Sequence, residues 1–212
     1  MSHPSETPAA RTPRIDHLLI ADMVALGARV LDVGCGDGDL LELLAERRQV
    51  DGRGIEKGRA EVSECVARGL SVIHGDADVD LEFYPDKSFD YAILSLTIQA
   101  TEAPKPVLEN LLRIGRHAIV SFPNFAHWRP RFQFTITGRM PVTDSLPYRW
   151  YDTPNIHLCS IRDFLDLCGE AGARVEKLIV LDGAGRAVSG KVPGFLQNLL
   201  GTQALVLLTR NG

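Results

Sequence analysis

Short apolar runs that alternate with helical stretches predict an α/β protein, in which helices cover both faces of a mostly parallel sheet. The length of 212 residues corresponds to one domain with elaborations, since a domain holds about 150 residues. Hydrophobic residues make up 45% of the chain and charged residues 24%, as in globular proteins that bury their own core. This composition excludes a disordered or collagen-like chain.

Six helices are predicted from stretches whose apolar residues recur at helical spacing. The first ends at Gly27, the second closes on the basic residues Arg47 and Arg48, which suit a helix C-terminus, and the third ends at Gly69. Prolines stand at the start of the fourth helix, where they are tolerated, and Ser160 can cap the fifth. The predicted ranges are 15–26, 40–47, 58–68, 103–114, 160–169 and 193–200.

Seven strands are predicted between these helices, at 29–33, 52–56, 70–74, 89–94, 116–122, 174–181 and 203–209. The first is rich in β-branched residues and is stopped by glycines, and the fifth is halted by Pro123. A short apolar helix, but no full crossover helix, separates the last two strands, and parallel neighbours need such a crossover. We therefore expect a seven-stranded sheet with an antiparallel edge strand.

Two segments do not fit the alternation. Residues 1–14 contain three prolines and no apolar run, which predicts a disordered tail rather than a secretory signal, ahead of a single domain over 15–212. Residues 123–160 contain both tryptophans, several prolines and several arginines, and predict an insertion or lid over the carboxyl edge of the sheet. Insertions at that edge commonly select the substrate or the partner.

Charge and cysteine content narrow the function classes further. The net charge of −4 gives no reason to expect binding to nucleic acid or to an anionic membrane, and no run approaches the ~18 apolar residues of a membrane span. The four cysteines form no C-x-x-C pair, and no cluster has the spacing of metal ligands. We expect a reduced cytoplasmic protein without a metal site.

A glycine-rich loop at residues 34–38 carries the strongest functional signal, because a buried strand runs through it directly into a helix. Glycines there permit positive φ angles and let a ligand approach the backbone. The spacing G-x-G-x-G differs from the dinucleotide fingerprint, and no G-K-[ST] follows it. The acids Asp32, Asp37 and Asp39 would repel a pyrophosphate and suit a ligand that carries an ammonium or a sulfonium.

Two further acids follow the next two strands. Glu56 stands 22 residues after Gly34, near the offset of about 20 at which an acid binds ribose hydroxyls. Asp76 follows the third strand, and all three sites lie where open α/β sheets bind ligands. The loop and both acids would surround one adenosine-containing molecule. The alternatives are a tight turn without a ligand and a solvated Glu56 paired with Lys57.

The strings VLDVGCGDGDL, GIEKGR, HGDAD and FDYAILSLTIQA resemble the class I S-adenosylmethionine-dependent methyltransferases. The segment SFPNFAHWRPRFQFTITGRMPVTDSLPYRWYDTPNIHLCSIRDF is similar to MetW-type methionine biosynthesis proteins, a far more specific match. The resemblance implies a Rossmann-like three-layer sandwich that binds S-adenosylmethionine or S-adenosylhomocysteine. The cofactor-binding residues it implies are Asp32, Val33, Gly34, Cys35, Gly36, Gly38, Glu56, Lys57, Asp76, Ala77 and Ser95.

Within that set, the resemblance assigns Asp32 and the glycine loop to the amino-acid end of the cofactor. It assigns Glu56 to the ribose, Asp76 with Ala77 to the adenine, and Ser95 to the side of the methyl group. It further implies a partner, a homoserine O-acyltransferase of the α/β-hydrolase fold, whose activity in methionine synthesis the chain supports. Cofactor binding could then report the end product of the pathway to its first committed step.

The alternative function is an active methyltransferase on an unknown small molecule, and the resemblance leaves methyl transfer by this chain open. No catalytic residue is assigned, because residues 95–100 lack the N-P-P-Y or D-P-P-Y string and any histidine or carboxylate. His127 and His157 are candidate bases, although structural histidines are commoner. Cys35 is a weak candidate nucleophile, since no histidine is near it in sequence.

The insertion also carries a group of aromatic and basic residues with three open interpretations. They are an amphipathic lid helix with ordinary core aromatics, a protein-docking face, and a platform for RNA. The net charge of −4 counts against RNA. The group consists of Trp128, Arg129, Arg131, Phe132, Phe134, Arg139 and Trp150.

Overall fold

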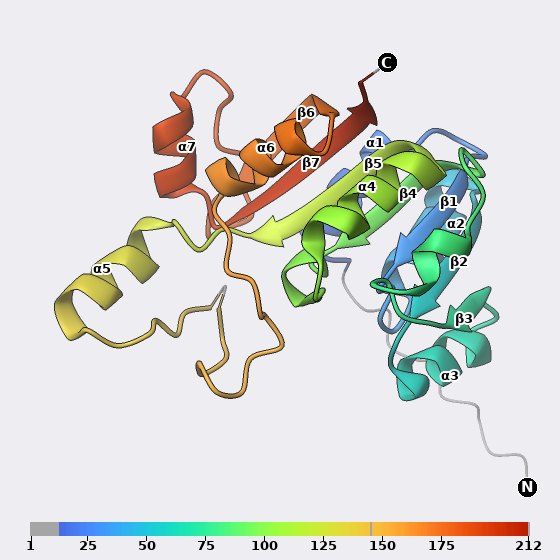
Figure 1. Ribbon diagram of the computed structural model, residues 1–212, viewed down its shortest axis with the longest axis horizontal. Coiled ribbons are helices and arrows are strands. Elements are labelled where there is room, and N and C mark those ends of the chain that lie inside the picture. Colours follow the sequence, from blue (N-terminus) through green and yellow to red (C-terminus); the bar gives the residue numbers. More distant parts are fainter. Residues whose placement is uncertain (1–12, 145, 212) are drawn as a thin grey trace, which may run out of the picture.

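The computed structural model describes residues 13–144 and 146–211, and these contain a seven-stranded sheet (Figure 1). Its order is β3-β2-β1-β4-β5-β7-β6. The strands are β1 (Arg29–Val33), β2 (Asp51–Glu56), β3 (Val72–His74), β4 (Phe89–Ser95), β5 (Gly115–Pro123), β6 (Ala173–Leu181) and β7 (Gln203–Arg210).

The pairing confirms a mostly parallel sheet with an antiparallel element at one end. Strands β1 to β5 pair in parallel, whereas β7 is antiparallel to both β5 and β6. The antiparallel strand is β7, which lies one place in from the edge strand β6. The short α7 (Gly194–Leu200) between them leaves no crossover helix, as the sequence indicated.

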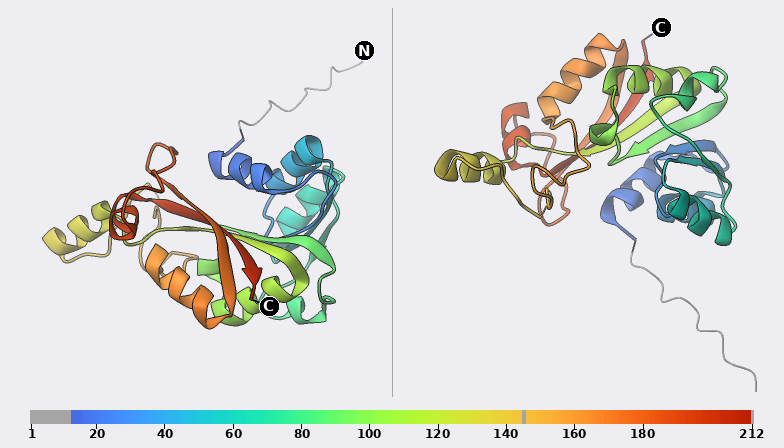
Figure 2. Two further views of the ribbon diagram at one scale, coloured as in Figure 1. Left: turned by 90° about the horizontal axis from the view of Figure 1, so that it is seen from above. Right: turned by 60° about the horizontal axis from the view of Figure 1, so that its bottom comes forward.

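Helices cover both faces of the sheet and complete three layers (Figure 2). On one face, α1 (Ile15–Met23) and α2 (Asp39–Arg48) bury residues such as Ile20 and Leu44, and α3 (Arg59–Ala67) adds Cys65. On the other face, α4 (Pro104–Ile114) and α6 (Ile161–Glu170) bury Leu111 and Phe164. None of the helices in the described ranges is long and apolar enough to cross a membrane.

The predicted elements are present, and their ends shift by at most three residues. The expected Ser160 cap of α6 is confirmed as a reciprocal box, in which Asp163 N–H donates to Ser160 Oγ at 3.2 Å and Ser160 N–H donates to Asp163 Oδ2 at 2.9 Å. Two short 3₁₀ helices, η1 (Asp80–Phe83) and η2 (Ile98–Ala100), were not predicted. Single turns of this kind carry too few residues to show a periodicity.

The insertion leaves the carboxyl end of β5 and forms α5 (Trp128–Thr137), and its described residues then lead to α6 as loops and turns (Figure 1). We call the described residues 128–144 and 146–158 the arm. In both figures α5 projects away from the sheet. The start of the arm is held by the buried Asn124, whose Nδ2 donates to the carbonyls of Asn198 at 2.7 Å and Gly201 at 2.8 Å.

Candidate functional site

Parallel pairing brings the carboxyl ends of β1, β2, β3 and β4 to one edge of the sheet, which we call the carboxyl edge. Asp32 lies in β1 opposite Ile93 of β4, and Glu56 of β2 lies opposite His74 of β3. Asp76 comes two residues after β3, and Ser95 ends β4. The topology therefore brings all four predicted polar positions to the same edge, where ligands of open α/β sheets bind.

The three glycines of the loop have positive φ angles of 68°, 55° and 84°, but for different reasons. A Cβ atom on Gly34 would lie 2.6 Å from Thr97 Cγ2, and one on Gly38 would collide with Leu70. A Cβ atom on Gly36 would meet nothing within 4 Å. Gly34 and Gly38 thus permit close packing of protein against protein, whereas Gly36 faces open space where a ligand could approach.

Asp32 is buried, with 1% of its surface exposed, and its Oδ1 accepts no hydrogen bond from the described residues. Burial, with the negative charge of Glu56 as a smaller cause, raises its pKa to about 8. A buried carboxyl without a partner is costly and calls for an explanation. An ammonium or sulfonium placed beside it would stabilise its ionised form, so the residues present fit a cationic ligand.

Glu56 joins the glycine loop to the turn after β2. Its Oε2 accepts from Gly36 N–H at 2.9 Å, and its Oε1 accepts from Gly58 N–H at 2.8 Å. A carboxylate offers about four acceptor positions, so two remain for hydroxyl donors. Glu56 is therefore fixed in place and still has acceptor positions free for a ligand.

Asp76 forms an ion pair with Lys57, which follows β2, and the Lys57 Nζ lies 2.7 Å from Asp76 Oδ2. The hydrogen bond and charge of Lys57 hold the pKa of Asp76 below its usual value. The loop is braced further, because Asp76 Oδ1 accepts from Asp78 N–H at 3.0 Å. Ala77, between them, is half-buried and packs against the core. Lys57 thus pairs with Asp76, and the alternative in which it pairs with Glu56 is not seen among the described residues.

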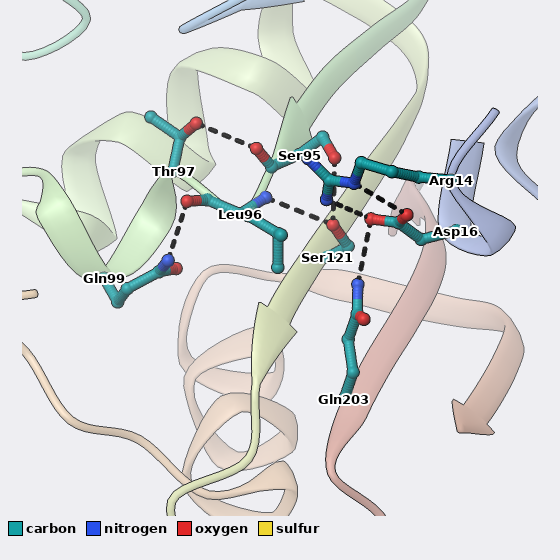
Figure 3. A network of polar contacts seen from close by, with 8 residues as sticks. All are labelled: Arg14, Asp16, Ser95, Leu96, Thr97, Gln99, Ser121 and Gln203. Atoms are coloured by element: carbon teal, nitrogen blue, oxygen red, sulfur yellow. Dashed lines mark hydrogen bonds and ion pairs between the residues drawn. The ribbon is translucent and has the colours of Figure 1, made fainter. Parts of the chain in front are cut away.

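A polar network lies at the end of β4 (Figure 3). Ser95 Oγ and Ser121 Oγ are 3.2 Å apart, and Leu96 N–H donates to Ser121 O at 3.0 Å. Leu96 has a φ of 54°, which strains a residue with a side chain by about 1–2 kcal/mol. Gln99 Nε2 donates to Leu96 O at 2.7 Å and helps to hold this conformation.

Sequence reasoning missed the contribution of α1 to this edge. Asp16 is buried and accepts three hydrogen bonds (Figure 3). Two come from the Arg14 guanidinium, of which the one from Nε measures 3.1 Å, and the third comes from Gln203 Nε2 at 3.1 Å. Burial would raise the pKa of Asp16, but these bonds and the Arg14 charge lower it overall. Arg14 falls within the expected tail, whose residues 1–12 lie outside the described residues. The available signal was Asp16 itself, an acid four residues before the buried Ile20.

Two of the predicted cofactor-binding side chains are buried in the protein. Val33 is fully buried in the core, so its side chain is not available to a ligand. Cys35 packs with Cys65 and Leu41, and burial raises the pKa of its thiol well above the usual range. Since the thiolate is the nucleophilic form, this environment argues against a nucleophilic Cys35.

The two candidate base histidines have structural contacts. His127 Nδ1 accepts from Arg129 N–H at 3.4 Å and caps α5, and burial lowers its pKa. His157 N–H donates to Gln99 O at 2.9 Å, and its Nε2 lies 3.3 Å from Glu102 O. These contacts favour the structural interpretation of both residues over the catalytic one.

Comparison with solved structures places the fold among S-adenosylmethionine-dependent methyltransferases. A TehB-like enzyme of this class from Corynebacterium glutamicum superposes with a TM-score of 0.62 at 19% identity, covering 96% of this chain and 91% of the other. An S-adenosylmethionine-dependent methyltransferase from Mesorhizobium loti gives 0.64 at 15% identity, covering 93% and 98%. At these identities the likeness shows the fold alone.

Sequence comparison is more specific. The family model described as methionine biosynthesis protein MetW matches residues 14–208. The bifunctional methionine biosynthesis protein MetXA/MetW of Rhodopirellula baltica is 34% identical over 190 residues, which cover 85% of this chain. The chain spans only 30% of the length of that relative. With its methyltransferase-like fold and this match over nearly its whole length, the chain belongs to the MetW family of methionine biosynthesis proteins.

Proposed function

We propose that this chain binds S-adenosylmethionine or S-adenosylhomocysteine at the carboxyl edge and supports a MetX-type homoserine O-acyltransferase. The observation that carries the cofactor proposal is Asp32, a buried carboxyl with an unpartnered Oδ1 in the strand that leads into the glycine loop. Both ligands carry an ammonium group, and S-adenosylmethionine adds a sulfonium. Either cation would compensate the charge that burial disfavours at Asp32.

The remaining residues at this edge supply complementary groups. Gly36 leaves open space beside the loop for the ligand, and Glu56 has acceptor positions left for the ribose hydroxyls. Asp76 and Ala77, on the loop braced by Lys57, would contact the adenine. Ser95, at the end of β4, would face the methyl group, which S-adenosylmethionine presents as an electrophile on its sulfonium.

Two observations support the partner. The family matched is one of methionine biosynthesis, and in the Rhodopirellula baltica relative MetXA and MetW are parts of one bifunctional protein. A domain fused to another in one organism is a reasonable partner for it in a second. A cofactor-binding partner would let the level of S-adenosylmethionine control acyltransferase activity at the start of the pathway.

The cofactor proposal is tested by calorimetric titration of S-adenosylmethionine into the folded protein and into two variants. Asp32→Asn removes the carboxyl that a cationic ligand would ionise and is expected to weaken binding at least tenfold. Asp90→Asn is the matched control, because Asp90 lies at the opposite end of β4, where it accepts from Arg29 N–H at 2.9 Å. Unchanged affinity in Asp32→Asn, or no binding by the unaltered protein, would contradict the proposed site.

The partner proposal is tested by assaying the purified MetX-type acyltransferase of the same organism with and without this chain. We expect its activity to depend on the chain and to change when S-adenosylmethionine is added to saturation. If the acyltransferase is equally active with and without this chain, the proposed supporting role is wrong. In that case, transfer of label from S-adenosylmethionine to a small molecule of a cell extract would favour the alternative, an active methyltransferase.

A further inference from the structure

The arm exposes large apolar side chains over its whole described length. Phe132 is 62% exposed, Ile136 68% and Trp150 73%. This excludes the interpretation of the arm aromatics as ordinary core residues. The other large apolar residues of the arm that are exposed are Trp128, Phe134, Met140, Val142, Tyr148, Tyr151, Ile156 and Leu158. Large apolar side chains left exposed in this number on one segment are typical of an interaction site.

The arm is hollowed between the end of α5 and the returning chain. A groove of about 1070 Å³ lies there, and its lining includes Met140, Val142, Trp150 and Tyr151. Arg139 and Arg149 also line it. The groove thus combines aromatic and aliphatic surface with two cations, a composition typical of the residues that dominate protein–protein binding energies.

Charge on the arm differs in sign from charge on the chain as a whole. The arm carries four arginines and two aspartates, whereas the net charge of the chain is −4. Within the described part of the chain, none of these four arginines forms an ion pair with a carboxylate. A partner surface that is apolar and edged by carboxylates would complement the arm.

Both ends of the arm are fixed to the body. At its start, the buried Asn124 also accepts from Ala126 N–H at 3.1 Å through Oδ1. At its end, His157 N–H donates to Gln99 O, next to the network at the end of β4. Because the ends are held, less conformational entropy is lost when a partner covers the arm.

We propose that the arm is the surface through which this chain binds the MetX-type acyltransferase, with the groove receiving an apolar segment flanked by carboxylates. This inference rests on the proposed function for the identity of the partner. The fusion relative supplies a partner that must be near in space, and the arm supplies uncovered apolar and cationic surface that can hold it.

The test measures binding of the purified acyltransferase from the same organism to the full chain by calorimetry at moderate salt. One variant combines Phe132→Asp with Ile136→Asp, four residues apart on α5, and a second is Trp150→Ala. The matched control is Phe83→Asp, because Phe83 lies in η1, outside the arm, and is 72% exposed. Thermal unfolding and titration with S-adenosylmethionine verify that each variant keeps its fold and its cofactor site.

We expect both arm variants to weaken binding at least tenfold and the Phe83→Asp control to bind as the unaltered chain does. Equal binding by all four proteins would overturn the inference while leaving the partner proposal intact. If the unaltered chain does not bind the acyltransferase, the partner proposal fails, and this inference fails with it. A dimer of this chain alone that the arm variants dissociate would identify a second copy as the occupant, and would also overturn the inference.

Discussion

The carboxyl edge and the arm differ in where their functional side chains find contacts: within the protein at the edge, and at the exposed surface on the arm. At the edge, Asp32 is buried, and the half-buried Glu56 and Asp76 are bonded within the protein, Glu56 by two backbone N–H groups and Asp76 by Lys57. In the arm, aromatic side chains such as Trp150 face outward, and the arginines lack carboxylate partners among the described residues. This difference underlies the two proposals, a small-molecule site at the edge and a docking surface on the arm.

The same residue type can therefore have a different role in each region. Gly34 and Gly138 both have positive φ angles, of 68° and 62°. At Gly34 the space beside the backbone is filled by Thr97, and at Gly138, which ends α5, it is empty. Substitutions of matched chemistry in the two regions should separate tight internal packing from open surface.

At a fixed, near-neutral pH, the largest loss of stability is expected from Gly34→Ala. The added Cβ would collide with Thr97, and the alanine would have to keep the strained positive φ of this position. We therefore expect the free energy of unfolding to fall by about 2–4 kcal/mol and the binding of S-adenosylmethionine to be lost. Gly138→Ala is the matched control and should cost only the strain, about 1 kcal/mol. Urea denaturation measures both, and equal losses would show that packing at the loop is loose.

Asn124→Ala should be next in size, at about 2–3 kcal/mol. It removes the donor to the Asn198 and Gly201 carbonyls and the acceptor for Ala126 N–H, and so leaves buried groups unpaired. Urea denaturation gives the loss. The arm should also become more sensitive to limited proteolysis, and a variant as stable as the unaltered chain would show that its start is not fixed by Asn124.

Asp32 should make stability fall as the pH rises. Its pKa is 3.8 in the unfolded chain and about 8 in the folded one, so between these values only the folded state holds the proton. The stability due to neutral Asp32 is complete below pH 3.8 and is lost as the pH rises through about 8, with a slope of up to about 1.4 kcal/mol per pH unit.

Asp32→Asn cannot titrate and should remove this slope. Denaturation of both proteins at one-unit intervals across that pH range measures the difference. Parallel curves for the two proteins would contradict the raised pKa. Because a cationic ligand favours the ionised carboxyl, the affinity for S-adenosylmethionine should rise with pH toward about 8.

The smallest effect is expected for Trp150→Ala. Trp150 is mostly exposed, and among the described residues its ring pairs edge-on with that of Tyr151, with 5.6 Å between the ring centres. We expect the free energy of unfolding to change by about 0.5 kcal/mol or less, although a buried tryptophan would cost about 3–5 kcal/mol. A loss above 2 kcal/mol in the isolated chain would show that the arm packs on itself and is not an uncovered surface.

The sheet and the edge could be predicted because their signals are local in sequence. β1 was predicted with its observed bounds, since a β-branched run stopped by glycines is a strand signal by itself. The spacing from Gly34 to Glu56 follows from the length of one strand–helix–strand unit. Parallel topology then brings Asp32, Glu56 and Asp76 to one edge.

The tertiary structure alone decided what each of these groups meets, because burial and contact depend on residues far away in sequence. Gly36, and not Gly34, faces open space because Thr97 fills the space beside Gly34. Asp32 has its raised pKa because the folded chain excludes water from it and leaves Oδ1 without a donor. The arm aromatics are exposed because their segment projects from the sheet, a direction that no periodicity encodes.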